Sequence, residues 1–164
     1  FSRKAEAQWK GTGKEGKGHI SLDSKAMVDV PYSFGTRFEG EEKGTNPEEL
    51  LGAAHAGCYT MQLSFLLNEE GFTATHLHTG AKVHFQDGEI TTIDLDLTGE
   101  VPEISADKFK EIANKAKEVC PVSKLFKADV NLKVTLPSKT RKAASSTVRY
   151  GSRRVLLKSL WKKI

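Results

Sequence analysis

Short runs in which apolar and polar residues alternate open the chain and predict β-strands. They lie at residues 5–10, 18–24 and 26–33 and are separated by turns that contain glycine or lysine. A period of two places apolar side chains on one face of a strand. We therefore expect an antiparallel meander, followed by a loop over residues 34–45, which are rich in glycine and charged residues.

The next segment carries the start and stop signals of a long helix. Asn46 is a favoured N-cap, Pro47 suits the first helical position, and Glu48 and Glu49 complement the helix dipole. Gly71 favours helix termination, so we expect the helix to run to about residue 70. Apolar residues surround most of its circumference, which is typical of a buried helix.

Two longer alternating runs follow and predict a hairpin about the Gln86-Asp87-Gly88 turn. A second helix is expected after the N-cap Ser105, and Pro121 starts a short helical turn. The expected strands are residues 73–85, 89–101 and 130–136, and the expected helices are residues 106–119 and 121–127. The order βββ-α-ββ-αα-β indicates an α+β fold with antiparallel sheet packed on a central helix.

The formal charge of +4 is unevenly distributed. Residues 139–164 hold nine of the 25 Lys and Arg and no acidic residue, which leaves 16 basic against 21 acidic residues in residues 1–138. The composition changes near Pro137, so we divide the chain into a domain of residues 1–137 and a basic extension of residues 138–164. The extension has a basic amphipathic pattern, which suits binding to an anionic membrane or to the acidic body. The alternative is that it is a segment foreign to the domain. It is assigned no function.

The sequence shows neither a secretory leader nor a run of 18 apolar residues, so we expect a cytoplasmic protein without a membrane span. Because the first residue is Phe rather than Met, a short leader stays open.

The segment from Gly11 to Gly18 satisfies the pattern G-x-G-x-x-G. A phosphate cradle needs a helix directly after the glycines, and a P-loop needs Ser or Thr after the lysine. Gly18 follows Lys17 instead, and the residues from His19 onward alternate as in a strand. We interpret the segment as a hairpin turn and expect no nucleotide site.

Three histidines of the predicted hairpin, His76, His78 and His84, are candidate metal ligands. No thiol or carboxylate partner falls at a matching spacing, so we expect no metal.

The chain has two cysteines, Cys58 within the long helix and Cys120 before Pro121. Two distant thiols in a chain without a leader favour redox-active or free cysteines over a structural disulfide. Burial within a helix would raise the pKa of Cys58 and make it inert, so a reactive thiolate there needs a nearby cation. Arg37 is the candidate cation. His55, one turn before Cys58, is a candidate base, although a packing or hydrogen-bonding role is favoured.

Two cysteine motifs make the chain resemble the OsmC branch of the OsmC/Ohr family of organic hydroperoxide reductases. The resemblance covers about residues 4–137 and does not extend into the basic extension. The residues that carry it are Arg37-Phe38-Glu39-Gly40, the run from Asn46-Pro47-Glu48-Glu49 to His55-Ala56-Gly57-Cys58, and Cys120-Pro121-Val122-Ser123.

The resemblance implies a thiol peroxidase without metal or organic cofactor, with antiparallel sheets wrapped around long central helices in an intertwined homodimer. By position, Cys58 would be the peroxidatic cysteine and Cys120 the resolving one. Arg37 would hold the thiolate and polarise the peroxide, and Glu48 would pair with Arg37. The substrate would be an organic hydroperoxide, and a dithiol, either lipoyl-type or a small thiol, would reduce the enzyme again.

Apolar residues near the motifs suggest a pocket that prefers alkyl or lipid hydroperoxides over hydrogen peroxide. They are Phe34, Phe38, Met61, Phe65 and Phe126, and the alternative is that they are ordinary core residues.

Glu48 and Cys58 are ten residues apart on one helix, which corresponds to about 15 Å of rise. We therefore expect Arg37 and Glu48 to serve the partner subunit's Cys58. Two alternatives stay open at this point: a non-catalytic stress or binding protein of the same fold, and a membrane- or nucleic-acid-associated module directed by the basic extension.

Overall fold

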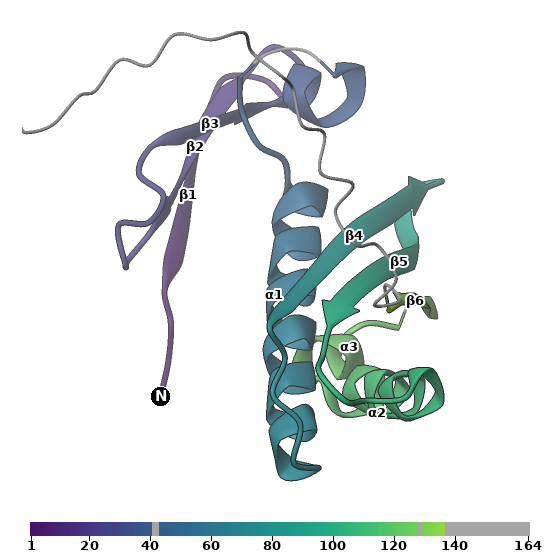
Figure 1. Cartoon of the computed structure of the whole chain (residues 1–164). Helices are drawn as coiled ribbons and strands as arrows, with labels where there is room; N and C mark the ends of the chain where they lie inside the picture. The colour runs from purple at the N-terminus through teal and green to yellow at the C-terminus, as the bar shows by residue number, and fades with distance from the viewer. Residues whose placement is uncertain (41–42, 128, 137–164) are drawn as a thin grey trace, which may run out of the picture.

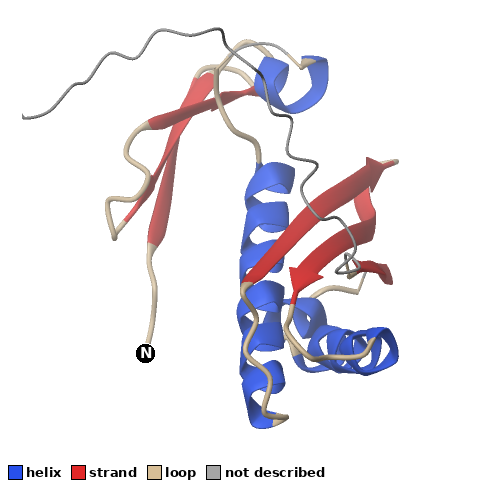
Figure 2. Ribbon diagram, in the orientation of Figure 1, coloured by secondary structure: helices blue, strands red, loops and turns tan. Residues whose placement is uncertain are grey.

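The computed structural model describes residues 1–40, 43–127 and 129–136 and contains two three-stranded sheets and one long helix (Figures 1 and 2). The predicted boundary near Pro137 and the basic extension lie outside these residues.

An antiparallel meander forms the first sheet, as predicted. Its strands are β1 (Ala5–Lys10), β2 (Lys17–Leu22) and β3 (Val30–Ser33), paired in the order β1-β2-β3. The G-x-G-x-x-G segment is the turn between β1 and β2, where the indole of Trp9 donates to the Thr12 carbonyl at 3.1 Å. A strand follows this turn, so the segment lacks the helix that a phosphate cradle needs.

The meander stands apart from the other helices and strands that the structure describes, and the segment after β3 connects it to them (Figure 1). Every side chain of β1 is exposed. A sheet normally buries one face against another layer, and the described residues of a single chain provide no such layer for the first sheet.

A single π-helical turn, η1 (Gly35–Glu39), forms within residues 34–45, for which a loop was predicted. Ser33 and Thr36 stabilise it reciprocally, because each hydroxyl accepts the other residue's backbone N–H, at 2.9 and 3.1 Å. The Thr36 hydroxyl also donates to the Thr45 carbonyl at 2.9 Å, which ties the turn to the start of the long helix. The helix was missed because its five residues are too few to show a hydrophobic period.

The long helix α1 (Pro47–Glu69) begins as predicted, with the Asn46 side chain accepting the Glu49 N–H at 2.8 Å. Gly71 follows it at φ +83°, a conformation that glycine adopts without strain. Within the chain, burial on all sides is not observed. One face is buried and includes His55, Tyr59, Leu63 and Leu67, whereas a second face, with Ala53, Ala54, Gly57, Met61 and Phe65, is exposed.

The second sheet is mixed rather than wholly antiparallel. Strands β4 (His76–Gln86) and β5 (Glu89–Glu100) form the predicted hairpin about Asp87 and Gly88, both at positive φ. Strand β6 (Asp129–Thr135) pairs with β5 in parallel. Alternation predicts a strand but not its direction, and the helical crossover from β5 to β6 is the connection that parallel pairing requires.

Between β5 and β6 run α2 (Ala106–Val119) and the five-residue α3 (Pro121–Leu125). The N-cap Ser105 accepts the Lys108 N–H, as predicted. Figure 1 shows α2 and α3 beside α1, on the side of the second sheet. The core lies between these elements and includes Tyr59 and Leu63 of α1, Ile93, Leu95 and Leu97 of β5, and Phe109, Ile112 and Ala116 of α2. The core therefore fixes the position of α2, and Cys120 lies at its C-terminal end.

Gly99 of β5 lets the Phe109 ring of α2 lie directly against the strand, since an added Cβ would overlap that ring. We expect Gly99→Ala to lower the free energy of unfolding by about 1–3 kcal/mol through overpacking. Urea unfolding of the reduced protein measures the change. Gly13→Ala is the matched control, because no atom lies within 4 Å of its added Cβ. Equal stabilities of the two variants would contradict this account of the contact.

Candidate active site

The two cysteines meet where α1 contacts the junction of α2 and α3. Their Sγ atoms lie 3.2 Å apart, with Cys120 fully buried and Cys58 partly exposed. Pro121 causes the break between the helices, because the residue before a proline is disfavoured in helical conformation. Cys120 accordingly has φ −58° and ψ 122°. A disulfide bond is about 2.05 Å long, so a small movement brings the sulfurs to bonding distance.

The buried face of α1 anchors both shorter helices through polar contacts. Tyr59 donates its hydroxyl hydrogen to the Ala113 carbonyl of α2 at 3.1 Å. The His55 Nε2 lies 2.8 Å from the Ser123 hydroxyl of α3, and the Phe126 ring packs on the imidazole at 5.4 Å between ring centroids. This contact supports the hydrogen-bonding role of His55 over the role of a base for Cys58. Sequence analysis included Ser123 in the second cysteine motif but assigned it no role.

The environment of Cys58 in its own chain disfavours the thiolate. Burial raises the pKa of the Cys58 thiol, and the adjacent Cys120 raises it further. The backbone N–H of Val122 hydrogen-bonds to the sulfur and opposes this shift. Among the described residues, no cation contributes to the titration of Cys58. Reactive thiolates need such a charge, so the cysteine pair alone is not an activated site.

Arg37 and Glu48 form a second cluster, as predicted. The Nη2 of Arg37 donates to Glu48 Oε1 at 2.6 Å, and Nε donates to Oε2 at 3.1 Å. Burial would raise the pKa of Glu48, but the hydrogen bonds and charge of Arg37 hold it below its usual value. The bond to Glu48 in turn raises the pKa of Arg37. The pair is therefore ionised and oriented.

Two aromatic rings orient the guanidinium further. The Cζ of Arg37 lies 4.9 Å from the centroid of the Phe38 ring and 5.3 Å from that of Phe85. Such contacts favour a cation over the ring face. Phe85 was missed by sequence analysis, because it lies at the end of β4 and only the fold brings it to η1. Within the described part of the chain, Nη1 of Arg37 has no hydrogen-bond partner and is available as a donor.

The structure brings the four predicted site residues together as two pairs, not as one cluster. The ten residues between Glu48 and Cys58 correspond to about 15 Å along α1. Figure 1 shows η1 near the start of α1, and α3 farther along the helix.

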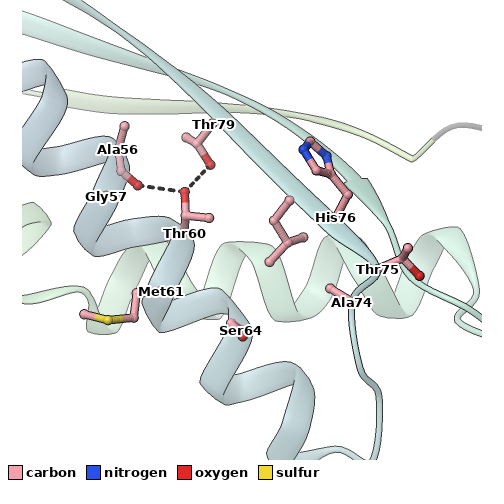
Figure 3. Close-up of a pocket in the computed structure, with 10 residues that line it drawn as sticks. Ala56, Gly57, Thr60, Met61, Ser64, Ala74, Thr75, His76 and Thr79 are labelled. Carbon is pink, nitrogen blue, oxygen red and sulfur yellow. Dashed lines mark hydrogen bonds between the residues drawn. The ribbon is translucent and has the colours of Figure 1, made fainter. Parts of the chain in front are cut away.

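The five predicted pocket residues also divide between locations. Phe34 and Phe38 contact each other beside Arg37, and Phe126 packs on His55. Met61 and Phe65 are exposed on α1, where Met61 borders a groove of about 600 Å³ between α1 and β4 (Figure 3).

Of the candidate metal ligands, His84 lies 2.7 Å from the Asp94 carboxylate through Nε2, and His76 lies in the groove beside α1. Within residues 1–40, 43–127 and 129–136, no group of three His, Cys, Asp or Glu side chains is arranged to hold a metal ion. The helices of the same residues include none that is long and apolar enough to span a membrane.

Comparison with known proteins decides the family. A family model described as OsmC-like protein matches residues 40–135. The chain belongs to the OsmC family. A relative named peroxiredoxin OsmC, from Escherichia coli strain K12, is 48% identical over 140 residues that cover 83% of this chain and 97% of the relative. The predicted membership is confirmed.

More distant relatives share the fold. An organic hydroperoxide resistance protein-like protein of Staphylococcus aureus strain MSSA476 is 25% identical over 71% of this chain and 84% of its own. The crystal structure of the organic hydroperoxide resistance protein OhrB of Bacillus subtilis superimposes with a TM-score of 0.58 at 25% identity, covering 82% of this chain and 98% of that one. An OsmC-like protein of Mycoplasma pneumoniae gives a TM-score of 0.66 at 16% identity, covering 83% and 97%. The predicted α+β fold class is confirmed.

Burial lowers the pKa of His55 below its ordinary value of 6.5, so the imidazole binds a proton less readily in the folded protein than in the unfolded chain. As the pH drops below about 6.5, the unfolded chain binds more protons at this histidine than the folded chain does, so the stability of the folded state falls. We expect His55→Gln to reduce this fall by up to about 1.4 kcal/mol per pH unit. Urea unfolding of the reduced protein at pH 7.5 and 5.5 measures it.

Tyr59→Phe serves as the control, because it weakens the same face of α1 without removing a group that titrates in this range. The Tyr59 pKa is raised by burial. Equal pH slopes in wild type and His55→Gln would show that the pKa of the imidazole is not lowered by folding.

Proposed function

We propose that this protein is a thiol-dependent peroxidase that reduces organic hydroperoxides to alcohols, and hydrogen peroxide less efficiently, in defence against oxidative and osmotic stress. The observation that carries the proposal is the pair of sulfurs 3.2 Å apart, one partly exposed and one buried. The names of the relatives, a peroxiredoxin and organic hydroperoxide resistance proteins, support this class of activity.

The roles follow from the accessibility of the two thiols. Cys58, the more exposed, attacks the peroxide as thiolate; the O–O bond breaks, an alcohol leaves, and a sulfenic acid forms at Cys58. Cys120 then displaces the hydroxyl group, giving water and the Cys58–Cys120 disulfide. A dithiol, lipoyl-type or small, reduces the disulfide by exchange, which suits the reducing cytoplasm.

A homodimer explains the surfaces that a single chain leaves uncovered. The exposed face of α1 carries apolar and small residues, among them Gly57, Met61 and Phe65, with Met61 60% and Phe65 58% exposed. Two grooves, of about 600 and 510 Å³, run between α1 and β4 beside this face. In Figure 3, Thr60 bonds Ala56 and Thr79 at the base of the first groove, while Met61 projects from α1. The unpacked meander supports an intertwined arrangement in which each chain covers the other.

The dimer also supplies the cation that Cys58 lacks. We assign Arg37 and Glu48 to the partner subunit's Cys58. The raised pKa of Cys58 in its own chain and the separation along α1 support this assignment. The free Nη1 of the guanidinium can stabilise both the thiolate and the alkoxide that leaves the peroxide.

The first test is intact mass after one equivalent of cumene hydroperoxide. We expect wild type to lose about two mass units as the disulfide forms, Cys120→Ser to retain a trappable sulfenic acid, and Cys58→Ser to stay unchanged. Unchanged mass in wild type, with both thiols titratable, would contradict the proposal and favour a non-catalytic protein of the same fold.

The second test mixes two inactive variants. Arg37→Ala alone should lower kcat/KM by about 10²–10³-fold. Mixed with Cys58→Ser, it should recover about a quarter of wild-type activity, because half of the dimers are mixed and each holds one complete site. Peroxide consumption measures activity, and native mass spectrometry measures exchange. In the control mixture, Arg37→Ala is combined with the double variant Arg37→Ala/Cys58→Ser, and no activity should be recovered. No recovery in the presence of mixed dimers would place Arg37 in the same chain's site.

A further inference from the structure

We propose that His55 and Ser123 form a latch that holds the resolving segment, residues 120–126, in register with α1, so that Cys120 stays within reach of Cys58 during disulfide formation. The inference rests on the proposed function and adds two positioning residues to it. Neither side chain is a reacting group, and each acts through the placement of Cys120.

The geometry of the latch is a matched spacing on two helices. His55 and Cys58 are three residues apart on α1, and Cys120 and Ser123 are three residues apart at the start of α3. His55 contacts Ser123 at 2.8 Å while Cys58 contacts Cys120 at 3.2 Å. The two contacts therefore lie one turn apart and run in opposite directions along the chain. Fixing the first contact fixes the distance between the sulfurs in the second.

Within the resolving segment, Cys120 is buried and Val122 and Phe126 pack on the core, but the helical turn that follows Cys120 is weakly held. Helix α3 has five residues, none of them buried, and Leu125 is 76% exposed. His55, in contrast, is fully buried, and in the described part of the chain its Nδ1 has no hydrogen-bond partner. The Ser123 hydroxyl is thus the polar anchor of the imidazole, and Phe126 covers the ring from the end of the segment. Hydrophobic burial alone gives so short and exposed a helix little positional definition.

The contact between His55 and Ser123 also persists when Cys58 is oxidised. Two contacts of the segment with Cys58, from the N–H of Val122 and the thiol of Cys120, involve the sulfur that changes. When Cys58 becomes a sulfenic acid, its added oxygen alters both contacts. The bond between His55 and Ser123 involves no reacting atom and persists.

The step that the latch serves is the second one. The thiol sulfur of Cys120 attacks the Cys58 sulfur, the S–S bond forms, and the S–O bond breaks. The hydroxide that leaves takes the thiol proton and becomes water, so the sulfenic sulfur is reduced and Cys120 is oxidised. A segment that has lost its register would delay this step and leave the sulfenic acid open to further oxidation.

Ser123→Ala is the test variant, because it removes one oxygen from a half-buried position and should preserve folding. Reduced protein is mixed rapidly with cumene hydroperoxide and quenched at intervals with dimedone, and intact mass counts sulfenic acid, disulfide and sulfinic acid. We expect sulfenic acid to form at the wild-type rate and the disulfide to form about five- to tenfold more slowly, as for the loss of one hydrogen bond. Under excess peroxide, sulfinic acid should accumulate. Ser123→Thr, which keeps the hydroxyl, should restore the wild-type rate.

Ser105→Ala is the matched control, because it removes the capping hydroxyl at the other end of α2 and tests for general loosening. An unchanged disulfide rate in Ser123→Ala, or equal slowing in Ser105→Ala, would overturn the latch. A wild type that forms neither sulfenic acid nor disulfide would instead overturn the proposed function. The two failures are therefore distinguishable in one experiment.

Discussion

The packing of one face of α1 against α2, α3 and the second sheet is the interaction on which the rest of the structure depends. His55, Tyr59 and Leu63 lie on this face, and all three are fully buried. The same face directs Cys58 toward Cys120 and ties both following helices to α1 by hydrogen bonds. Since α1 also carries Glu48 in its first turn and an exposed apolar face, a single 23-residue helix sets the geometry of both residue clusters and of the proposed dimer interface.

Burial and reactivity conflict at this helix. The core that positions Cys58 also raises the pKa of its thiol, whereas peroxide reduction needs the thiolate. Arg37 resolves this conflict only if it reaches the sulfur, and its own chain holds it at the start of α1 with Glu48, Phe38 and Phe85. Because the cation and the thiol are separated within each chain, activity depends on assembly. This dependence is the physical reason for the dimer that we propose.

Much of this architecture could be predicted where the signal is local. The N-cap Asn46, the Asp87-Gly88 turn and the N-cap Ser105 each act within a few residues, and the elements that they begin or connect lie close to where they were expected. The cysteine motifs predicted the family, which the comparisons confirm.

The features that sequence analysis predicted wrongly or missed depend on contacts between residues that are distant in the sequence. The parallel pairing of β6 follows from the crossover through α2 and α3, and alternation in residues 130–136 contains no information about it. The contact of Phe85 with Arg37 joins residues 48 positions apart, and that of His55 with Ser123 joins residues 68 apart. The exposed face of α1 was expected to be buried because its composition is that of a buried helix, and none of the described helices and strands of the chain covers it.

The division between a rigid helix and a short one suits the proposed chemistry. Cys58 lies in the middle of α1, where backbone hydrogen bonds on both sides prevent its movement. Cys120 lies at a junction with extended backbone, followed by five helical residues that bury no side chain. Cys120 and the resolving segment must therefore make the movement that brings the two Sγ atoms from 3.2 Å to bonding distance. Such a segment must be free enough to move by about 1 Å yet constrained enough not to slip by a turn, which would separate the sulfurs by about 5 Å. One hydrogen bond at the neighbouring turn, outside the reacting atoms, meets both requirements.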